Sequence, residues 1–308
     1  MSLVPIPDHG ELLEKVLLNG VSNENTRRAY SRALQKFMAW YSTKGFADVS
    51  RQVMNQYRAE LEASGAATAS VNQELSALRR MLRNAAAAGF VDREKAHEAA
   101  QVTNTRALGT RAGNWLTPEQ AMALLLAPDE SKLKGKRDRA ILAVLVGCGL
   151  RREELVTQNV EDIQMREDRW VIPHLVGKGK RVRLVPVPAW VKERLDAWTR
   201  AGEIRERRIF RAVRKNGVLS RESLSATAIW QIVLKHAHAA GIPHLTPHDL
   251  RRTCAKLCRR LGGELEQIQF LLGHSSIKTT EDYLGGEQKI RKAVNDRLFA
   301  RSKKLRDA

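Results

Sequence analysis

Hydrophobic positions in the first hundred residues recur at helical spacing. In the stretch from Asn23 to Tyr41, the apolar and aromatic positions three or four apart are Tyr30, Leu34, Phe37 and Met38. Two further stretches, Val53 to Glu62 and Thr68 to Ala88, follow the same pattern. Such spacing places apolar side chains on one stripe of an α-helix. It predicts three helices that pack into a bundle.

The ends of these helices carry their own signals. Ser22 or Asn23 is expected to cap the first helix, because either side chain can accept a hydrogen bond from an unpaired helical N–H. Gly89 follows the third helix, where a glycine commonly ends the run. Basic residues lie between the apolar positions of the third helix: Arg79, Arg80 and Arg83. We therefore expect the bundle to have a basic face.

The periodicity fades in the segment QVTNTRALGTRAGN, residues 101–114. This segment is polar, basic and contains glycine, which is typical of a linker. It predicts a boundary between an N-terminal helical domain at 1–100 and a second domain at 115–308. Arg111 in the linker is expected to contact a phosphate backbone.

The second domain starts with a helix signal and contains one region with the pattern of strands. Thr117, Pro118 and Glu119 combine a capping residue, a proline at the first helical position and an acid in the first turn. Residues 169–176 and 182–187 are expected to be two strands joined by a turn with the sequence GKGK. The rest of the chain is predicted to be helical, with interruptions near Phe210 and at residues 241–243. The fold class is therefore mainly α with a small β-sheet.

The charge balance changes the expected partner. The chain of 308 residues has 53 Lys and Arg against 34 Asp and Glu, a formal net charge of +19. Such an excess raises the local concentration of a polyanion and makes binding sensitive to salt. A basic protein with no such partner is the alternative, but a nucleic acid is favoured.

The three cysteines, Cys148, Cys254 and Cys258, have no disulfide-framework or zinc-site spacing. We expect them to be small buried hydrophobes and expect no metal site. The N-terminal residues lack a signal-peptide pattern, and no apolar stretch approaches the length that spans a bilayer. A cytoplasmic location with no membrane partner follows as an expectation.

Two basic clusters have competing interpretations. Arg151 follows the break at Gly149 and starts a helix in which Glu154 lies one turn on, so the two can pair. Taken alone, this is an exposed charge pair. The predicted turn at residues 177–181 carries Lys178, Lys180 and Arg181, and is either a solvated tip or a contact to DNA. It lacks the spacing of a P-loop.

The C-terminal third contains two more clusters. Thr246 and Pro247 open a helix, so His248 and Arg251 share one face of its first turn. An anion at this helix start would gain from the helix dipole. Further on, a glycine ends a helix before His274, and the following segment leads to Tyr283. A tyrosine at such a position is, by itself, more often half-buried than catalytic.

Together these residue types supply what phosphodiester transfer without a metal requires. Guanidinium groups can clamp the phosphate oxygens, and their charge does not depend on pH. Imidazoles can donate hydrogen bonds or move protons, and a lysine can protonate a leaving oxygen. A tyrosine hydroxyl can attack and store the bond as a phosphotyrosine.

In order along the chain, the segments GLRREEL, GKGKRVRLVPV, HDLRRT and LLGHSSIKTTEDY resemble the catalytic domain of the tyrosine recombinase (phage integrase) family. The resemblance implies that Arg151 and Arg251 clamp the phosphate, with Glu154 supporting Arg151. It implies further roles for Lys178 as general acid, for His248 and His274 as the active-site histidines, and for Tyr283 as nucleophile. The N-terminal helices are similar to the family's SAM-like core-binding domain. This implies that the domain at 1–100 binds DNA, with Arg79, Arg80 and Arg83 as candidate contacts, and that the two domains form a C-shaped DNA clamp. The segment after Arg251 departs from the family in lacking its usual aromatic residue.

The resemblance implies a site-specific DNA recombinase or integrase that acts without a cofactor. It would cut one strand at a time, form a 3′-phosphotyrosine, and pass through a Holliday junction. Its partners would be double-stranded DNA with inverted-repeat core sites and further copies of itself, as a dimer on a site and a tetramer in a synapse. The tail after Tyr283 has an apolar stripe that could pack on its own domain or on a neighbouring protomer: Ile290, Val294, Leu298 and Phe299.

Two other functions fit parts of the same sequence. A type IB topoisomerase-like enzyme would use the same tyrosyl chemistry to relax supercoils, and a site-specific DNA-binding protein would need no catalysis. The setting is also open between a mobile element, as integrase or transposon recombinase, and a Xer-type enzyme that resolves chromosome or plasmid dimers. The target sequence, the directionality and any accessory factors are not encoded in these patterns.

Overall fold

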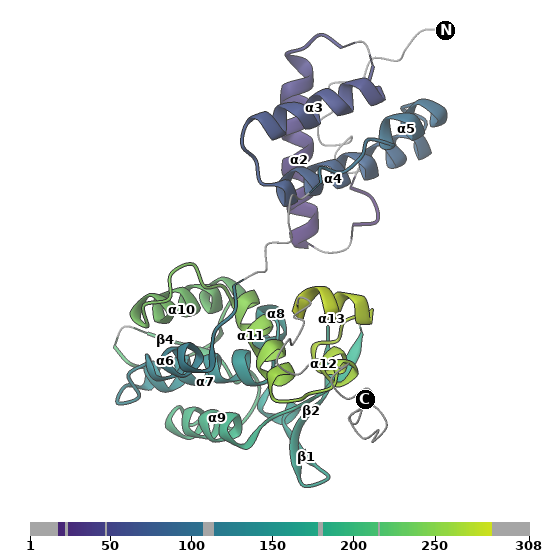
Figure 1. The fold of residues 1–308 in the computed structure, drawn as a ribbon. Coiled ribbons are helices and arrows are strands. Elements are labelled where there is room, and N and C mark those ends of the chain that lie inside the picture. Colours follow the sequence, from purple (N-terminus) through teal and green to yellow (C-terminus); the bar gives the residue numbers. More distant parts are fainter. Residues whose placement is uncertain are drawn as a thin grey trace, which may run out of the picture. The chain divides into compact units, whose positions relative to one another are not determined.

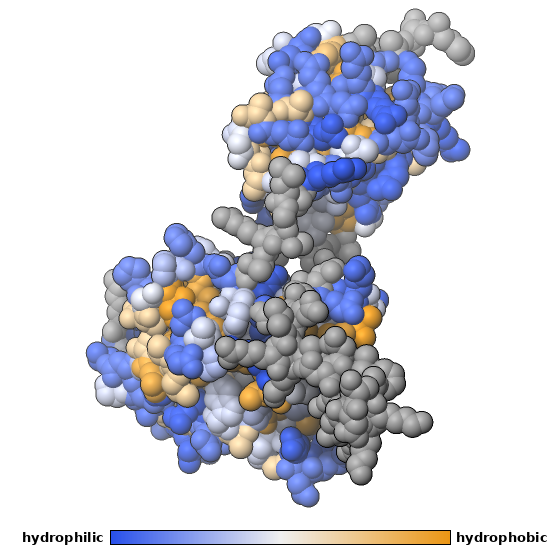
Figure 2. Space-filling model, in the orientation of Figure 1, coloured by the Kyte–Doolittle hydropathy of each residue, from blue (hydrophilic) through white to orange (hydrophobic). Residues whose placement is uncertain are grey.

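The computed structural model describes residues 18–21, 24–46, 48–106, 114–177, 181–214 and 216–284. The chain divides into two compact units, Met1–Arg111 and Ala112–Ala308 (Figure 1). Each unit has its own hydrophobic core. On the face drawn in Figure 2, hydrophilic residues dominate the surface of each unit.

The N-terminal unit is a bundle of helices. The described helices are α2 (Glu24–Ser42), α3 (Arg51–Ala63), α4 (Thr68–Ala87) and α5 (Arg93–Ala100). The first three confirm the helices predicted from periodicity, and α5 is an addition. Ser22 and Asn23, the expected caps of α2, lie outside the described residues. Gly89 follows α4 with a φ of +78°, the left-handed conformation that a glycine after a helix adopts.

The core of this unit is built on the predicted apolar stripes. Phe37 of α2 is fully buried, and its ring meets that of Tyr57 of α3 edge-to-face at 5.1 Å between centroids. From α4, Val71, Leu75 and Leu78 are also fully buried. Aromatic rings and α4 aliphatic side chains thus hold the helices together.

The first residues of the expected linker pack on the bundle. Val102 is buried, and the Arg79 guanidinium donates to its carbonyl oxygen at 2.6 Å. Asn72 and Thr105 exchange two hydrogen bonds, at 2.8 and 3.0 Å. Residues 101–106 therefore continue the N-terminal unit, and residues 107–113, which include Arg111, lie outside the described residues.

The C-terminal unit combines helices with two small sheets. Its described helices are α6 (Pro118–Leu126), α7 (Leu133–Gly147), α8 (Arg152–Val156), the 3-10 helix η1 (Val160–Asp162), α9 (Ala189–Ala201), α10 (Ala226–Ala239), α11 (Pro247–Arg260), α12 (Leu265–Leu272) and α13 (Ile277–Leu284). Its strands are β1 (Gln164–Arg166), β2 (Arg169–Val176), β3 (Val182–Pro186), β4 (Arg211–Val213) and β5 (Leu219–Ser223).

Helix α7 is the centre of this unit. Residues 140–146 are all buried, so the helix is enclosed on every side, which its apolar sequence allows. α9 packs along it, and the fully buried Trp198 of α9 donates its indole N–H to the Ile209 carbonyl at 2.9 Å. The enclosed helix α7 thus anchors the segment that follows it, which contains Gly149 and Arg151.

The predicted pair of strands is present, and the expectation of one strand region was wrong. β2 pairs antiparallel with β3, as expected, and also with the unpredicted β1. A second antiparallel pair, β4 and β5, lies in the interruption noted near Phe210. Its strands are short and polar, so alternation gave no signal, but Asn216 and Gly217 form a dipeptide typical of hairpin turns.

The predicted helix starts are confirmed by their caps. Thr117 caps α6, with Pro118 at the first helical position, and Thr246 caps α11, with Pro247 there. In both, the side chain three residues after the cap accepts a hydrogen bond from the cap's backbone N–H. Of the helices that the structure describes, none has the length and apolarity needed to cross a bilayer.

Candidate active site

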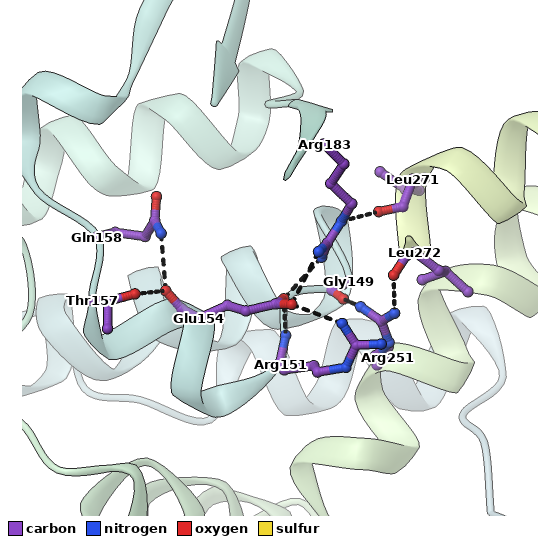
Figure 3. Close-up of polar contacts among 9 residues, drawn as sticks. All are labelled: Gly149, Arg151, Glu154, Thr157, Gln158, Arg183, Arg251, Leu271 and Leu272. Atoms are coloured by element: carbon purple, nitrogen blue, oxygen red, sulfur yellow. Dashed lines mark hydrogen bonds and ion pairs between the residues drawn. The ribbon is translucent and has the colours of Figure 1, made fainter. Parts of the chain in front are cut away.

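A buried carboxylate organises two arginines at the start of α8 (Figure 3). Glu154 is 5% exposed and accepts hydrogen bonds from the backbone N–H of Arg151 at 2.8 Å and from its guanidinium at 2.7 Å. Arg183 of β3 makes two parallel bonds to the same carboxylate, at 3.0 and 2.8 Å. Burial alone would raise the pKa of Glu154, but the bonds from Arg183 and Arg151 hold it below its usual value. The carboxylate therefore stays charged and fixes both guanidiniums.

Arg251 lies beside this pair and is anchored by backbone. Its side chain is 1% exposed, and its two terminal nitrogens donate to the carbonyl oxygens of Gly149 and Leu272. Burial, together with the positive charge of Arg151, lowers its pKa to about 10. The group stays protonated at neutral pH, so three guanidiniums share one region with the buried carboxylate of Glu154.

Close backbone approaches make this arrangement possible. Gly273 ends α12 with a φ of +63°, and a Cβ there would lie 2.7 Å from the Cδ of Arg183. Gly177 leaves space beside the carboxylate, since its Cβ would lie 3.2 Å from the Oε1 of Glu154. Glycine at these two places lets β3 and the end of α12 approach the arginines.

Tyr283 lies on α13 between the two predicted histidines. Its ring meets those of His248 and His274 edge-to-face, with centroids 5.3 and 5.2 Å apart. Its hydroxyl donates to the His248 carbonyl oxygen at 3.2 Å, and the Arg252 guanidinium lies over its ring at 4.8 Å. Burial raises the pKa of Tyr283, while the charges of Arg251, Arg252 and Arg151 oppose that rise.

Both histidines are held neutral by their surroundings. Burial lowers the pKa of His248, and the charges of Arg252 and Arg251 lower it further. The pKa of His274 falls to about 4, first through burial and then through the charge of Arg251. A neutral imidazole can accept a proton on one nitrogen while it donates a hydrogen bond from the other. At neutral pH both rings are therefore able to serve proton transfer.

A fully buried threonine contacts one of these rings. Thr280 of α13 is 0% exposed, and its Oγ1 lies 3.0 Å from the Nδ1 of His274. The same helix ends in a small hydrophobic cluster with α11 and α12: Ala255, Ile268, Leu272 and Leu284. This cluster and Thr280 position α13 beneath the site.

The structure gathers five of the six predicted catalytic residues, together with Glu154: Arg151, His248, Arg251, His274 and Tyr283. Lys178, the sixth, and Lys180 lie outside the described residues. Arg181 is described and exposed. Among the described residues, the predicted guanidiniums, imidazoles and phenol thus lie in one region of the C-terminal unit.

The arginines predicted to bind DNA through the bundle differ in their contacts. Arg79 and Arg83 line a groove between α4 and α5, together with Arg93 and His97. Arg80 instead donates to the carbonyl oxygen of Asn19 at 3.3 Å, which ties residues 18–21 to α4. The groove gathers positive charge on one side of the N-terminal unit.

Two residues of the site were missed by the sequence analysis. Arg183 comes from a strand 29 positions after its partner Glu154, and no local pattern links the two. Its signal was only its place in the segment GKGKRVRLVPV. Arg252 follows Arg251 directly, but helix geometry points neighbouring side chains in different directions, so its contact with Tyr283 needed the fold.

Two of the three cysteines are buried, as expected. Cys148 and Cys254 are buried and Cys258 is partly buried, all with free thiols. Burial raises the pKa of Cys148 to about 12, so it is an unreactive thiol. Within the described ranges, no group of three or more His, Cys, Asp or Glu side chains is arranged to hold a metal ion.

The chemistry available at the site follows from these contacts. Arg151 and Arg251 present fixed positive charge to an anion, and that charge is needed most when a phosphorane-like transition state forms. The phenol of Tyr283 lies within the same group of side chains. The arrangement suits attack by a tyrosine on a phosphodiester.

Comparison with known proteins gives matches over most of the chain. Residues 114–289 match the phage integrase family, and residues 11–89 match the phage integrase N-terminal SAM-like domain. The chain is 30% identical over 296 residues to tyrosine recombinase XerD of Pseudomonas putida, covering 91% of this chain and 94% of that protein. It is 30% identical over 300 residues to tyrosine recombinase XerC of Thermodesulfovibrio yellowstonii, covering 94% and 95%.

Solved structures share the fold at lower identity. The XerH site-specific recombinase bound to palindromic difH substrate, in a post-cleavage complex, matches with a TM-score of 0.70 and 19% identity, covering 89% of this chain and 80% of that chain. A lambda integrase dimer bound to a COC′ core site matches with a TM-score of 0.67 and 18% identity, covering 91% and 95%. The fold of this chain is therefore that of these recombinases.

Proposed function

The chain belongs to the phage integrase family, and from that premise we propose that Tyr283 is the nucleophile of its DNA cleavage and rejoining. The protein is a tyrosine recombinase, an enzyme of site-specific DNA recombination. The observation that carries the assignment of the site is the position of Tyr283, between His248 and His274 and beside the guanidiniums.

The cleavage step uses the residues in separate roles. The Tyr283 oxygen attacks phosphorus, the bond from phosphorus to the 5′ oxygen breaks, and a 3′-phosphotyrosine forms. Arg151 and Arg251 stabilise the charge on the non-bridging oxygens. His248 is neutral at physiological pH and accepts the phenolic proton, and Lys178 protonates the departing 5′ oxygen.

Rejoining reverses the same step on another strand. A 5′ hydroxyl from the partner duplex attacks the phosphotyrosine, the tyrosyl oxygen leaves, and Tyr283 regains its proton. The energy of the phosphodiester is retained in the tyrosyl ester, so the exchange needs neither ATP nor a divalent ion. Exchange of one strand pair gives a Holliday junction, and exchange of the second pair resolves it.

We assign DNA contacts on the same physical basis. Arg79, Arg83 and Arg93 in the groove between α4 and α5 are placed to bind phosphates of a core site. Arg111, Lys180 and Arg181 are proposed as further contacts, and Arg80 as a residue that supports α4. Two copies would bind inverted arms of the core site, and two such pairs would form the synapse, the tail from residue 285 onward being one candidate link between copies.

The biological setting is a finer proposal. Relatives named XerD and XerC match more than nine-tenths of the chain, which favours a Xer-type enzyme over an integrase of a mobile element. Three free cysteines and a DNA substrate favour the cytoplasm. Sequencing the DNA junctions formed in cells that express the protein would separate resolution of dimers from insertion of an element.

A plasmid assay tests the recombinase against its closest alternative. The target site is first selected from genomic fragments by binding to the purified protein. A supercoiled plasmid with two copies of the site should recombine in buffer with chelator and without ATP, and the Tyr283→Phe variant should bind the site without recombining it. A plasmid without the site should stay supercoiled. Relaxation of that plasmid by the wild-type protein would favour a topoisomerase instead.

A further inference from the structure

Thr280 is a buried hydroxyl that the cleavage mechanism above does not use. It lies on α13 three residues before Tyr283, so the two side chains share one face of the helix. Its side chain is 0% exposed, and its Oγ1 is 3.0 Å from the Nδ1 of His274. The nucleophile's own helix therefore contacts the ring of a catalytic histidine.

The burial of Thr280 determines the direction of this hydrogen bond. A hydroxyl has one hydrogen to donate, and within the part of the chain that the structure describes its side chain has no other hydrogen-bond partner than His274. If the Nδ1 of His274 carried the proton and donated it, the hydroxyl hydrogen would be buried without an acceptor, which is costly. The Thr280 hydroxyl therefore donates, and Nδ1 accepts.

An acceptor Nδ1 fixes the protonation of the whole ring. The ring is neutral, because its pKa of about 4 lies well below physiological pH. The groups that face it are the guanidiniums of Arg251, Arg151 and Arg183 and the ring of His248, and all of them disfavour a second proton. A neutral ring with an acceptor Nδ1 carries its proton on Nε2. That nitrogen can then donate to a phosphate oxygen.

We propose that Thr280 is a positioning residue that holds His274 in its Nε2–H tautomer. The proposal rests on the assignment of Tyr283 and His274 to the cleavage site. Because Thr280 and Tyr283 are on the same short helix, the docking of α13 delivers the nucleophile and prepares the donor in one event. A protomer whose α13 is displaced would lose both, so a half-assembled site would neither attack nor stabilise the phosphate.

The test compares three variants on a nicked suicide substrate that carries the selected site. Thr280→Val keeps the shape of the side chain and removes the hydroxyl, and Thr280→Ser keeps the hydroxyl. Thr279→Val is the matched control, since Thr279 is the exposed neighbour on the same helix. We expect the single-turnover rate of adduct formation to fall by about tenfold in Thr280→Val, as one hydrogen bond is lost. It should stay within about twofold of wild type in the other two.

A second readout reports the ring itself. Nitrogen-15 NMR of the free protein at neutral pH, assigned by loss of the signals in His274→Gln, should show Nδ1 unprotonated and Nε2 protonated in the wild type. Thr280→Val should show a mixture of the two tautomers. Thr280→Ala takes its place in both assays if the valine variant does not fold.

The two readouts separate the possible failures. A wild-type ring with its proton on Nδ1 would overturn the proposal, and so would a Thr280→Val variant (or its Thr280→Ala substitute) in which either the cleavage rate or the ring spectrum is unchanged. In each of these results the wild type would still form its adduct at Tyr283. Absence of that adduct would instead contradict the proposed function.

Discussion

The arginine side and the tyrosine side of the candidate site are held in different ways. On the arginine side, one buried carboxylate bonds Arg151 and Arg183, and two backbone carbonyls bond Arg251 (Figure 3). On the tyrosine side, Tyr283 makes one hydrogen bond of 3.2 Å to the described part of the chain, and its other contacts there are made by its ring. Helix α13, which carries Tyr283, packs on a small hydrophobic cluster rather than on the main core of the C-terminal unit.

This difference indicates that the two sides of the site differ in how much they can move. The charges proposed to bind the phosphate are preorganised, so little rearrangement is needed when charge develops in the transition state. The proposed nucleophile is held by few contacts, and segments with few buried contacts open at low free-energy cost. We therefore expect the arginines to stay fixed, and Tyr283 to dock into the site or move out of it with α13.

The largest effect is expected when the central carboxylate, Glu154, is removed. Glu154→Gln removes the counter-charge of the partly exposed Arg151 and of Arg183, whose side chain is 9% exposed. Breaking a buried pair such as Glu154–Arg183 costs about 3–5 kcal/mol. We expect the free energy of unfolding at pH 7 to fall by that amount, measured by urea denaturation. Cleavage of the suicide substrate should fall more than about a hundredfold. The exposed Glu153→Gln should change the free energy of unfolding by less than about 0.5 kcal/mol.

The same variant should respond to pH in a defined direction. The pKa of Glu154 is lowered from 4.5 in the folded state, so its stabilisation is present above that unfolded value and is lost as pH falls through the folded value. The difference in unfolding free energy between wild type and Glu154→Gln should therefore shrink in acid. A difference that grows below pH 4.5 would mean that the carboxylate is not held charged.

A second change tests whether Arg251 acts through its forked shape. Arg251→Lys keeps the charge, but an ammonium cannot hold both the Gly149 and Leu272 carbonyls and also face a phosphate. Single-turnover cleavage should fall by about 10²–10³, the usual effect of removing one transition-state donor. Affinity for the site, measured at the same salt, should change far less. Equal losses in binding and cleavage would show that Arg251 serves ground-state binding alone.

On the tyrosine side, we expect a smaller effect on cleavage when Arg252 is replaced. Its guanidinium lies over the Tyr283 ring and opposes the rise of that tyrosine's pKa. Arg252→Met should slow cleavage by about tenfold, which matches a partly buried cation–π contact. It should also move the alkaline limb of the pH–rate profile to higher pH. Arg259→Met, an exposed position on the same helix, is the control, and an equal effect there would point to lost DNA attraction instead.

The smallest expected effect is on stability between pH 7 and 5. The pKa of His274 is lowered from 6.5 to about 4 on folding, so the unfolded state binds its proton first. The stability that this group contributes is complete above the pKa of the unfolded state. It is lost as the pH falls from that pKa towards the pKa of the folded state. His274→Gln cannot titrate, so its unfolding free energy should decline less over this range than that of the wild type. An equal or steeper decline in His274→Gln would show that His274 is not a buried neutral group.

Much of the molecule was accessible from sequence because its signals are local. Periodic apolar stripes gave α2, α3 and α4, and the Thr-Pro pairs gave the starts of α6 and α11. Residues of the site that belong to motifs, such as Arg151 and His248, were found because their neighbours mark them. These features depend on residues within a few positions of one another.

What the sequence did not give depends on distant residues or weak patterns. Arg183 gained its role from a carboxylate on another element, and Thr280 from burial that only packing reveals. The β4–β5 pair was missed because three-residue and five-residue strands are too short for alternation to be seen. Residues 101–106 were assigned to a linker because their bonds to α3 and α4 come from far along the chain.

The most direct test of the account locates the covalent bond itself. The adduct trapped on the suicide substrate is digested with protease and nuclease, and mass spectrometry identifies the peptide that keeps the nucleotide. The chain has four tyrosines, and the other three, Tyr30, Tyr41 and Tyr57, belong to the N-terminal unit. The account predicts a nucleotide on Tyr283 alone. A nucleotide on any other residue, or an adduct that persists in Tyr283→Phe, would contradict it.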